Sequence, residues 1–485
     1  MGKPLFALSL LLALVPALPG FAASVSIRTD GAPIPVSDGT IGSQLVPDVA
    51  VAGESGVLAV WHGRRNPDYK DLVVSGRFLS RSGPDGPSFA VSGDGPSYPS
   101  LNTQLSGDAE RGWLVVWEDV GWNDGHQPGV FARFIATDGA MAAEPYIVPE
   151  TTQGFQSQPR VAIGSDGRFL VLWADLDLLL FKERVLTRIV EGEGPGASEE
   201  VLLRDGYPSS SSVRTPHLVA ALPGGRYAIA DRDRYSPLRI IEADGSAGAP
   251  LGTSASPSFG APLAIASCSD GRLVLVVSWR DYDMPEHVGF VWFDANGVPL
   301  TSRTDLGEVE EIPATRVTVR TTPECNAIVS LDSSSRLVAA NGSILSPPFQ
   351  TGPTVLPVFM DRKPYSSIVA VDESSYFAVF ETDTNGTDLD IEGQWLCAMS
   401  DDDSPCGNAT CAGDSDAASP AERIKASDAI YALRAATGLA ECVDCRCDIN
   451  GSGTVTVSDA LRILKVSVGQ DVPLSCPVCG DAPLS

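Results

Sequence analysis

The chain has 485 residues, of which 43% are hydrophobic and 20% are charged. These proportions are typical of a folded globular protein and exclude a disordered chain, a coiled coil and a protein with several membrane spans. The 61 acidic residues against 34 basic ones give a formal charge of −27. Nucleic acid and anionic membrane surfaces are therefore disfavoured as partners, because both would repel the chain.

Residues 1–22 are predicted to be a signal peptide. Lys3 supplies the positive start, residues 5–18 are mostly apolar, and small residues precede a cut after Ala22. The apolar segment is shorter than the roughly 20 residues that a membrane-spanning helix needs. We therefore expect a secreted or periplasmic protein with no membrane span.

Residues 23–398 are dominated by one repeating pattern. An unbroken apolar segment recurs at residues 57–61, 113–117, 169–173, 227–231, 273–277, 327–331 and 376–380. The ends of these segments are 56, 56, 58, 46, 54 and 49 residues apart. A period near 50 residues indicates a solenoid or a propeller.

The repeats favour a propeller, because strands rather than helices fill them. Each apolar segment is typical of a strand buried on both faces. Further strands are predicted at residues 74–78, 130–135, 185–189, 238–241, 288–293 and 391–396, and Asp-Gly or Asn-Gly turns suit the hairpins. We predict a mainly β protein with a seven-bladed β-propeller, and leave six or eight blades open because the repeat at residues 327–331 is poorly marked. Residues 25–28 are expected to complete the last sheet and close the ring.

The body of the chain resembles secreted bacterial propeller repeat proteins of the "P-x-VA…G…LVVW" type. This resemblance implies a fold and no particular activity. Two of the ten cysteines, Cys268 and Cys325, stand just before the apolar strands of consecutive repeats. A disulfide between neighbouring blades is expected, since an exported chain meets an oxidising compartment.

The repeats contain no compact catalytic motif. Several apolar strands end in Trp followed by an acid, and such a ring could hold a sugar. We favour Trp packing between blades, with the acids capping solvent-facing loops. None of the four His residues lies near a Gly-x-Ser-x-Gly turn, and no His pair has zinc-ligand spacing. The loop at residues 383–390 could wrap calcium, although a plain acidic hairpin loop is preferred.

Residues 399–410 are predicted to form an acidic linker, and residues 411–485 a separate module. The segments 427–438 and 458–469 each read as an amphipathic helix with Ser at the N-cap and Gly at the end. A twelve-residue loop precedes the second helix and predicts a calcium site. Its ligands would be the side chains of Asp448, Asn450 and Ser452, the carbonyl of Thr454, Thr456 directly or through water, and Asp459.

This module resembles a type I dockerin, and the second unit carries the resemblance. The resemblance implies folding on Ca²⁺ and docking to a cohesin partner. The first loop, residues 414–428, departs from the pattern, because it is too long and lacks the turn glycine. Eight cysteines lie in the last ninety residues, from Cys397 onward, and are expected to form disulfides, with a zinc site at the two Cys-x-x-Cys pairs (Cys442, Cys445, Cys476 and Cys479) as the alternative.

Our leading prediction is a secreted, monomeric, non-enzymatic binding protein with Ca²⁺ as its cofactor and no catalytic residues. Its partner would be a cohesin-like protein or a carbohydrate. The alternative is a carbohydrate-active hydrolase whose propeller funnel holds two acids and whose tail recruits it to a complex.

Overall fold

The structure is a computed structural model of the whole chain. Between residues 25 and 400 it describes all residues except 39–41, 53–55, 65–71, 94–99, 120–128, 143, 151–153, 178–181, 193, 195–197, 207–217, 231–237, 250, 252–259, 281–285, 310–316, 332, 354–364, 373–374 and 384–387. Beyond residue 400 it describes residues 433, 436–437, 452, 454–467 and 470. The predicted signal peptide therefore lies outside the described residues.

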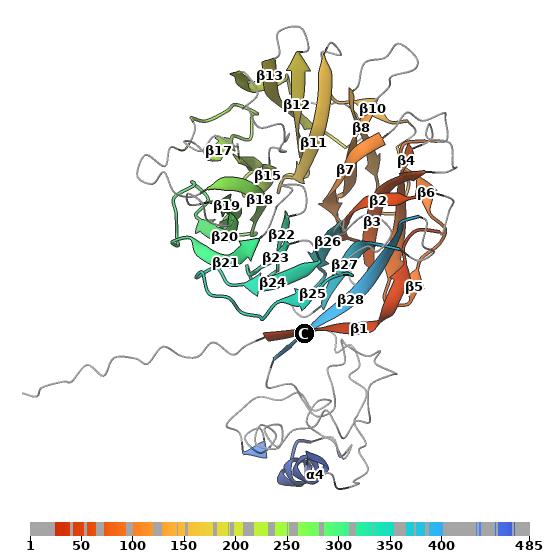
Figure 1. Cartoon of the computed structure of the whole chain (residues 1–485), viewed down its shortest axis with the longest axis vertical. Coiled ribbons are helices and arrows are strands. Elements are labelled where there is room, and N and C mark those ends of the chain that lie inside the picture. Colours follow the sequence, from red (N-terminus) through yellow and green to blue (C-terminus); the bar gives the residue numbers. More distant parts are fainter. Residues whose placement is uncertain are drawn as a thin grey trace, which may run out of the picture.

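The described strands form a ring of antiparallel sheets, a β-propeller (Figure 1). The first sheet contains β2 (Gln44–Val51), β3 (Gly56–Arg64), β4 (Leu72–Ser80), β5 (Gly83–Pro84) and β6 (Phe89–Ala90). Next come β7 (Ser100–Asp108), β8 (Gly112–Asp119), β9 (Gly129–Ile135) and β10 (Tyr146–Ile147). The third sheet contains β11 (Phe155–Ile163), β12 (Phe169–Asp177), β13 (Lys182–Val190) and β14 (Val201–Gly206).

The remaining sheets continue around the ring in chain order. One contains β15 (Leu218–Leu222), β16 (Arg226–Ala230) and β17 (Leu238–Ile241), and the next β18 (Ala261–Ser267), β19 (Leu273–Trp279), β20 (Glu286–Phe293) and β21 (Thr304–Val309). They are followed by β22 (Val317–Thr321), β23 (Ala327–Leu331), β24 (Ser334–Val338) and β25 (Phe349–Gln350). The last sheet contains β26 (Ser366–Ala370), β27 (Ser375–Thr382), β28 (Asp390–Ser400) and β1 (Val25–Pro35).

The apolar segments identified in the sequence form the second strand of each sheet. In β8, every residue from Gly112 to Glu118 is buried. Both faces of these strands are covered because neighbouring sheets pack face to face. Between the last and first sheets, for example, Phe377 and Trp395 contact the cluster that holds Val57 and Trp61. The predicted strand at 227–231 corresponds to β16, which ends at Ala230.

The sequence missed strand β24, which completes the poorly marked repeat. Its first residues are serines, and strands usually contain β-branched or aromatic residues. Within the sheet, the Ser330 and Ser335 hydroxyls lie 2.6 Å apart, and the Ser335 hydroxyl donates to Thr351 Oγ1 at 3.4 Å. These buried hydroxyls bind one another across the sheet, so polar residues can occupy interior positions.

Strand β1 closes the ring, as predicted, and it is longer than expected. It pairs with β28 from Val25↔Ser400 to Pro35↔Glu392, with an irregularity between Asp30 and Ile34. The chain then crosses to the first sheet, where Val36 N donates to Ile391 O at 2.9 Å. The last sheet is therefore built from both ends of the repeat region.

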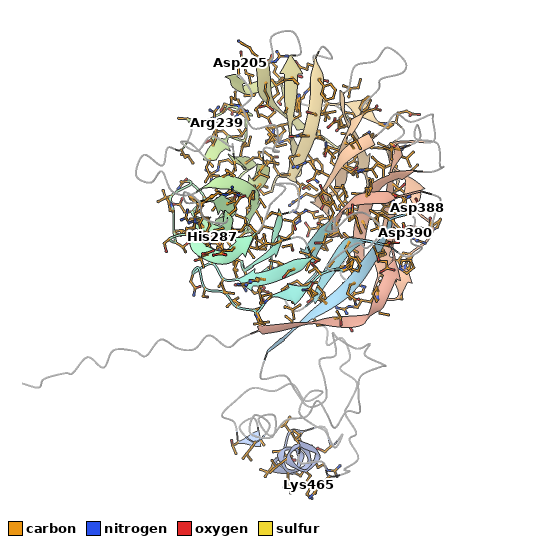
Figure 2. The ribbon with its side chains drawn as sticks, viewed as in Figure 1. Asp205, Arg239, His287, Asp388, Asp390 and Lys465 are labelled. Atoms are coloured by element: carbon orange, nitrogen blue, oxygen red, sulfur yellow. A yellow bond between two sulfur atoms is a disulfide. The ribbon has the colours of Figure 1, made fainter. Side chains whose placement is uncertain are left out.

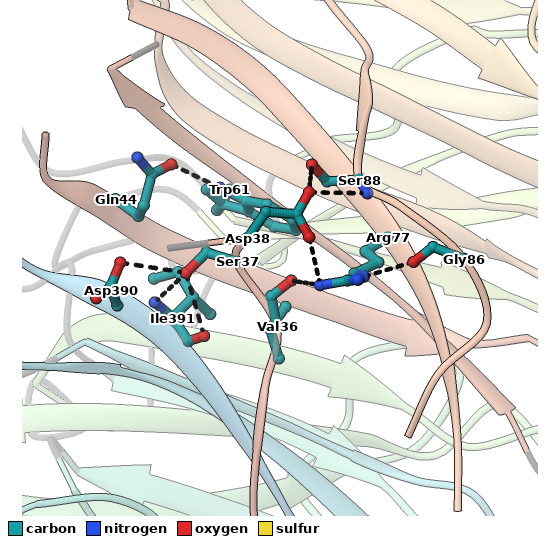
Figure 3. A network of polar contacts seen from close by, with 10 residues as sticks. All are labelled: Val36, Ser37, Asp38, Gln44, Trp61, Arg77, Gly86, Ser88, Asp390 and Ile391. Carbon is teal, nitrogen blue, oxygen red and sulfur yellow. Dashed lines mark hydrogen bonds and ion pairs between the residues drawn. The ribbon is translucent and has the colours of Figure 1, made fainter. Parts of the chain in front are cut away.

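Polar contacts fix this crossing (Figure 3). Asp38 forms an ion pair with Arg77 of β4 at 2.7 Å, and Arg77 Nη1 donates to Val36 O at 3.1 Å. Ser37 Oγ donates to Asp390 Oδ1 at 3.4 Å and accepts from Ile391 N at 3.1 Å. Asp390 belongs to the predicted acidic loop at residues 383–390, of which residues 384–387 lie outside the described residues (Figure 2). Its hydrogen bond with Ser37 helps to close the ring.

The predicted disulfide between neighbouring blades is confirmed. Cys268 is bonded to Cys325, which joins the sheet of β18–β21 to the sheet of β22–β25. Cys397 is disulfide-bonded as well, and the other seven cysteines lie outside the described residues.

Replacing Cys268 and Cys325 together by serine is expected to destabilise the propeller. The bridge joins residues 57 apart in sequence, and a loop of this size corresponds to a loss of about 4 kcal/mol in the free energy of unfolding. The urea midpoint of the double variant should fall accordingly. An unchanged midpoint would show that contacts between the two sheets hold them together without the covalent bond.

Beyond residue 400, one helix has both ends within the described residues: α4 (Val457–Ser467), at the place where the second amphipathic helix was predicted. Our choice of Ser458 as its N-cap is wrong, because the helix begins one residue earlier. Thr456 takes this position: its N–H and hydroxyl donate to Asp459 Oδ2 at 2.8 and 2.6 Å, and Asp459 N donates to Thr456 O at 3.0 Å. Among the described helices, none has both the length and the apolar character needed to cross a bilayer.

Candidate functional site

A channel runs along the axis of the ring and contains a cavity of about 450 Å³. Its walls are the first strands of the sheets, namely β2, β7, β11, β15, β18, β22 and β26. Most lining side chains are small or aliphatic, so the few charged ones define the chemistry of the cavity.

Asp48 of β2 is the buried carboxylate of the channel lining in the described part of the chain. Its Oδ1 accepts from Val49 N at 3.0 Å, from Arg320 Nη2 at 2.9 Å and from Ser367 Oγ at 2.9 Å. Its Oδ2 accepts from Leu105 N at 3.0 Å. One side chain thus connects four sheets.

Two arginines share the channel with Asp48. Arg320 forms the ion pair just described, with its side chain partly exposed to the cavity. Arg160 of β11 donates from Nη1 to Pro159 O at 2.8 Å. Burial lowers the pKa of Arg160 to about 10, and the neighbouring Asp48 carboxylate only partly offsets this effect.

The acids that follow the apolar strands have another role: they connect neighbouring sheets. Glu381 Oε1 accepts from Val46 N of the first sheet at 3.0 Å, and Glu118 Oε2 accepts from Gln158 N of the third sheet at 3.2 Å. Val46 and Gln158 have φ values of 50° and 55°, an uncommon conformation for such residues. Both acids are buried, so our interpretation of such acids as caps of solvent-facing loops is wrong for these two positions.

Three of the Trp residues at the strand ends pack between neighbouring sheets. Trp61, Trp117 and Trp173 are at most 2% exposed and belong to the clusters between sheets. The packing interpretation of these residues is therefore confirmed.

The described histidines do not form a catalytic group. His62 is buried in β3. His287, on the outer part of its sheet, stacks on Trp279 and lies 3.0 Å from Asp305 Oδ2 (Figure 2). His126 and His217 lie outside the described residues.

The predicted calcium ligands are described only in part. Asp448 and Asn450 lie outside the described residues. The Ser452 hydroxyl donates to the Thr454 carbonyl at 3.0 Å, so two predicted ligands lie together. Thr456 and Asp459 also meet, at the start of α4. The described oxygens are of the kind that Ca²⁺ prefers.

The charged residues of the channel were missed at the sequence level, although the repeat contained a signal for them. Asp48 and Arg160 occupy the variable position of the Pro-x-Val-Ala pattern, in Pro47–Ala50 and Pro159–Ala162. This position lines the channel in the first and third sheets. Its place in the sheet is equivalent in both, since Asp48 lies opposite Val60 and Arg160 opposite Leu172. The residue that differs between repeats at this position, and not the residues that recur, would have pointed to Asp48 and Arg160.

No protein-family model and no curated protein matches the chain. Among solved structures, it is similar to an α-L-arabinofuranosidase of Fusarium graminearum, with 10% identity over 76% of this chain and 98% of the other and a TM-score of 0.42. An α-L-arabinanase of Penicillium chrysogenum aligns with 11% identity over 77% and 98%, at a TM-score of 0.43. The β-propeller domain of the Trilobed protease of Pyrococcus furiosus aligns with 12% identity over 73% and 94%, at a TM-score of 0.39.

These matches correct our leading functional prediction. Several of the structures that align with most of this chain are glycoside hydrolases. Our leading prediction of a non-enzymatic binding protein stands against this finding and is not proposed again. Because identities near one tenth concern the fold and not the site, the case for hydrolysis below rests on the residues of the channel.

Proposed function

We propose that the protein is a carbohydrate-active hydrolase whose substrate enters the central channel. We also propose that each sheet is one blade, which gives a seven-bladed ring. The observation that supports hydrolysis is the buried Asp48 carboxylate, held among fixed donors at the wall of a 450 Å³ cavity. Ligand sites for small molecules have volumes of about 300–1,000 Å³.

Asp48 would supply the base or nucleophile of the carboxyl pair that glycoside hydrolysis uses. Among the described residues, its Oδ2 accepts one hydrogen bond, from Leu105 N, whereas Oδ1 accepts three. Oδ2 therefore keeps acceptor capacity for a water molecule or a sugar hydroxyl. Arg320 and Ser367 on Oδ1 orient the carboxylate, so that Oδ2 can remove a proton from the attacking water or attack the anomeric carbon directly. The glycosidic C–O bond would break as the second carboxyl group of the pair gives its proton to the leaving oxygen.

Release of reducing ends from a panel of plant and microbial polysaccharides tests this proposal. The wild-type chain should hydrolyse at least one of them, and Asp48→Asn should lower the rate about 10²–10⁴-fold, as expected for loss of a general base. Asp294→Asn, at an exposed turn, is the matched control and should keep the wild-type rate. A panel with no turnover, or equal rates for Asp48→Asn and wild type, would refute the proposal.

The C-terminal module is proposed to bind Ca²⁺ through Asp448, Asn450, Ser452, Thr454, Thr456 and Asp459, and to attach the enzyme to a cohesin-like partner. Export through the predicted signal peptide belongs to the same proposal. The described contacts of Ser452 with Thr454 and of Thr456 with Asp459 support the calcium loop.

Removal of calcium is expected to loosen the C-terminal module and leave the propeller folded. Only two formal carboxylates, Asp448 and Asp459, serve the loop, so the affinity should be that of extracellular calcium modules, about 10⁻⁴–10⁻³ M. Calorimetric melting in a chelator should then shift one transition only. A profile unchanged by both chelator and millimolar calcium would contradict this site.

A further inference from the structure

The charges that line the channel are unevenly matched. Arg160 and Arg320 face the cavity near one carboxylate, that of Asp48. Asp108 also lines the channel, at the end where β7 finishes, but it pairs with Arg111 at 3.1 Å. In a chain with a formal charge of −27, the region around Asp48 thus carries one more positive than negative charge.

Arg160 is the arginine that lacks an anionic partner. Arg320 binds Asp48 at 2.9 Å, and the remaining bonds of Asp48 go to neutral donors. Of the five N–H donors on a guanidinium, Arg160 uses one, to the carbonyl of its own neighbour Pro159. No carboxylate of the described residues lies within ion-pair distance of it.

Burial without a matching acceptor is unfavourable for such a group. The low pKa of Arg160, about 10, has burial as its largest cause. An incoming anion would supply hydrogen bonds that the guanidinium lacks within the described part of the chain. Thr318 of β22 also lines the channel, and its Oγ1 has no hydrogen-bond partner in the described part of the chain.

We infer that Arg160 binds the carboxylate of an acidic sugar, so that the hydrolase acts on glycans that contain uronic acid. This inference rests on the proposed function. A carboxylate matches the planar fork of the guanidinium. It also carries the single negative charge that balances the region, whereas a dianion such as phosphate would leave a buried charge uncompensated next to Asp48.

The position of Arg160 would also orient the substrate. Arg160 and Asp48 line the same cavity, so a sugar whose carboxylate is bound by Arg160 shares that cavity with the proposed reacting group. The cavity volume of about 450 Å³ accommodates one or two sugar rings within the usual size of ligand sites.

Calorimetric titration of the full chain with galacturonate, glucuronate, galactose and inorganic phosphate tests the inference. At least one uronate should bind with at least about tenfold higher affinity than galactose and phosphate. Arg160→Gln should weaken uronate binding by at least about tenfold, as expected for loss of a charge-assisted contact. Arg272→Gln, an exposed arginine paired with Asp270 in its own turn, is the control and should bind uronate like wild type.

Two results would overturn the inference: galactose or phosphate binding as tightly as uronate, or a folded Arg160→Gln variant with unchanged uronate affinity. If Arg160→Gln does not fold, Arg160→Lys keeps the charge without the planar fork and should weaken uronate binding while near-UV circular dichroism stays native. Hydrolysis of neutral glycans without uronate binding would refute the inference alone. Uronate binding without turnover of any glycan would refute the proposed function alone.

Discussion

Replacing Asp48 by alanine is expected to lower the free energy of unfolding by about 3–5 kcal/mol, the cost of breaking a buried ion pair by removing one partner. The loss follows from the position of the carboxylate, which binds β7, β22 and β26 as well as its own strand. Without it, two arginines would remain in the channel with no counter-charge. Urea unfolding followed by circular dichroism measures the effect.

Two further variants separate the contributions to this loss. Ser367→Ala removes one neutral donor and should cost only about 1 kcal/mol. Asp48→Asn combined with Arg320→Gln removes both charges and should recover much of the stability, but not the hydrolytic activity. If the double variant were as unstable as Asp48→Ala, packing and not charge would dominate the contribution of Asp48.

A chain that begins at Gly42, and therefore lacks β1, is expected to lose about 5 kcal/mol or more of stability relative to one that begins at Val25. The missing segment contributes Val36, which is fully buried, and the partly buried Val25, Ile27 and Ile34. A fully buried aliphatic side chain contributes roughly 1.5–3 kcal/mol. The truncation also leaves β28 as an unpaired edge, so the shortened chain should aggregate more readily.

Point variants keep this prediction testable if the truncated chain does not fold. Val36→Ala should cost about 1–3 kcal/mol, because Val36 contacts the cluster of Trp61, Phe377 and Trp395. Ile147→Ala is the control, since Ile147 is 42% exposed and should leave the urea midpoint unchanged. Equal midpoints for Val36→Ala and wild type would show that ring closure contributes little to stability.

The central strands could be predicted from the sequence because they are buried on both faces, which leaves a continuous apolar segment in each repeat. Closure of the ring and the Cys268–Cys325 bridge could be predicted for a related reason. The places of the closing strand and of the two cysteines relative to the repeats indicate which sheets they join. Strand β24 could not, because its serines are satisfied by partners such as Thr351 that are distant from them in the sequence.

The channel site was missed because its residues do not repeat. Asp48, Arg160 and Arg320 come from three sheets, and Asp48 contacts Arg320 across the sheet of β26–β28 that lies between theirs in the ring. Arg320 and Asp48 are 272 residues apart in the chain. Likewise, Glu118 and Glu381 could be recognised as strand-end acids, but their bonds to residues in left-handed conformation depend on how neighbouring sheets pack.

A crystal structure of the chain with a bound acidic oligosaccharide would test most directly whether the channel is the active site. We expect a sugar ring in the channel, with a hydroxyl or the scissile oxygen within hydrogen-bond distance of Asp48 Oδ2 and a carboxylate on Arg160. An oligosaccharide bound on the outer face of the ring, with the channel left to water, would contradict the account.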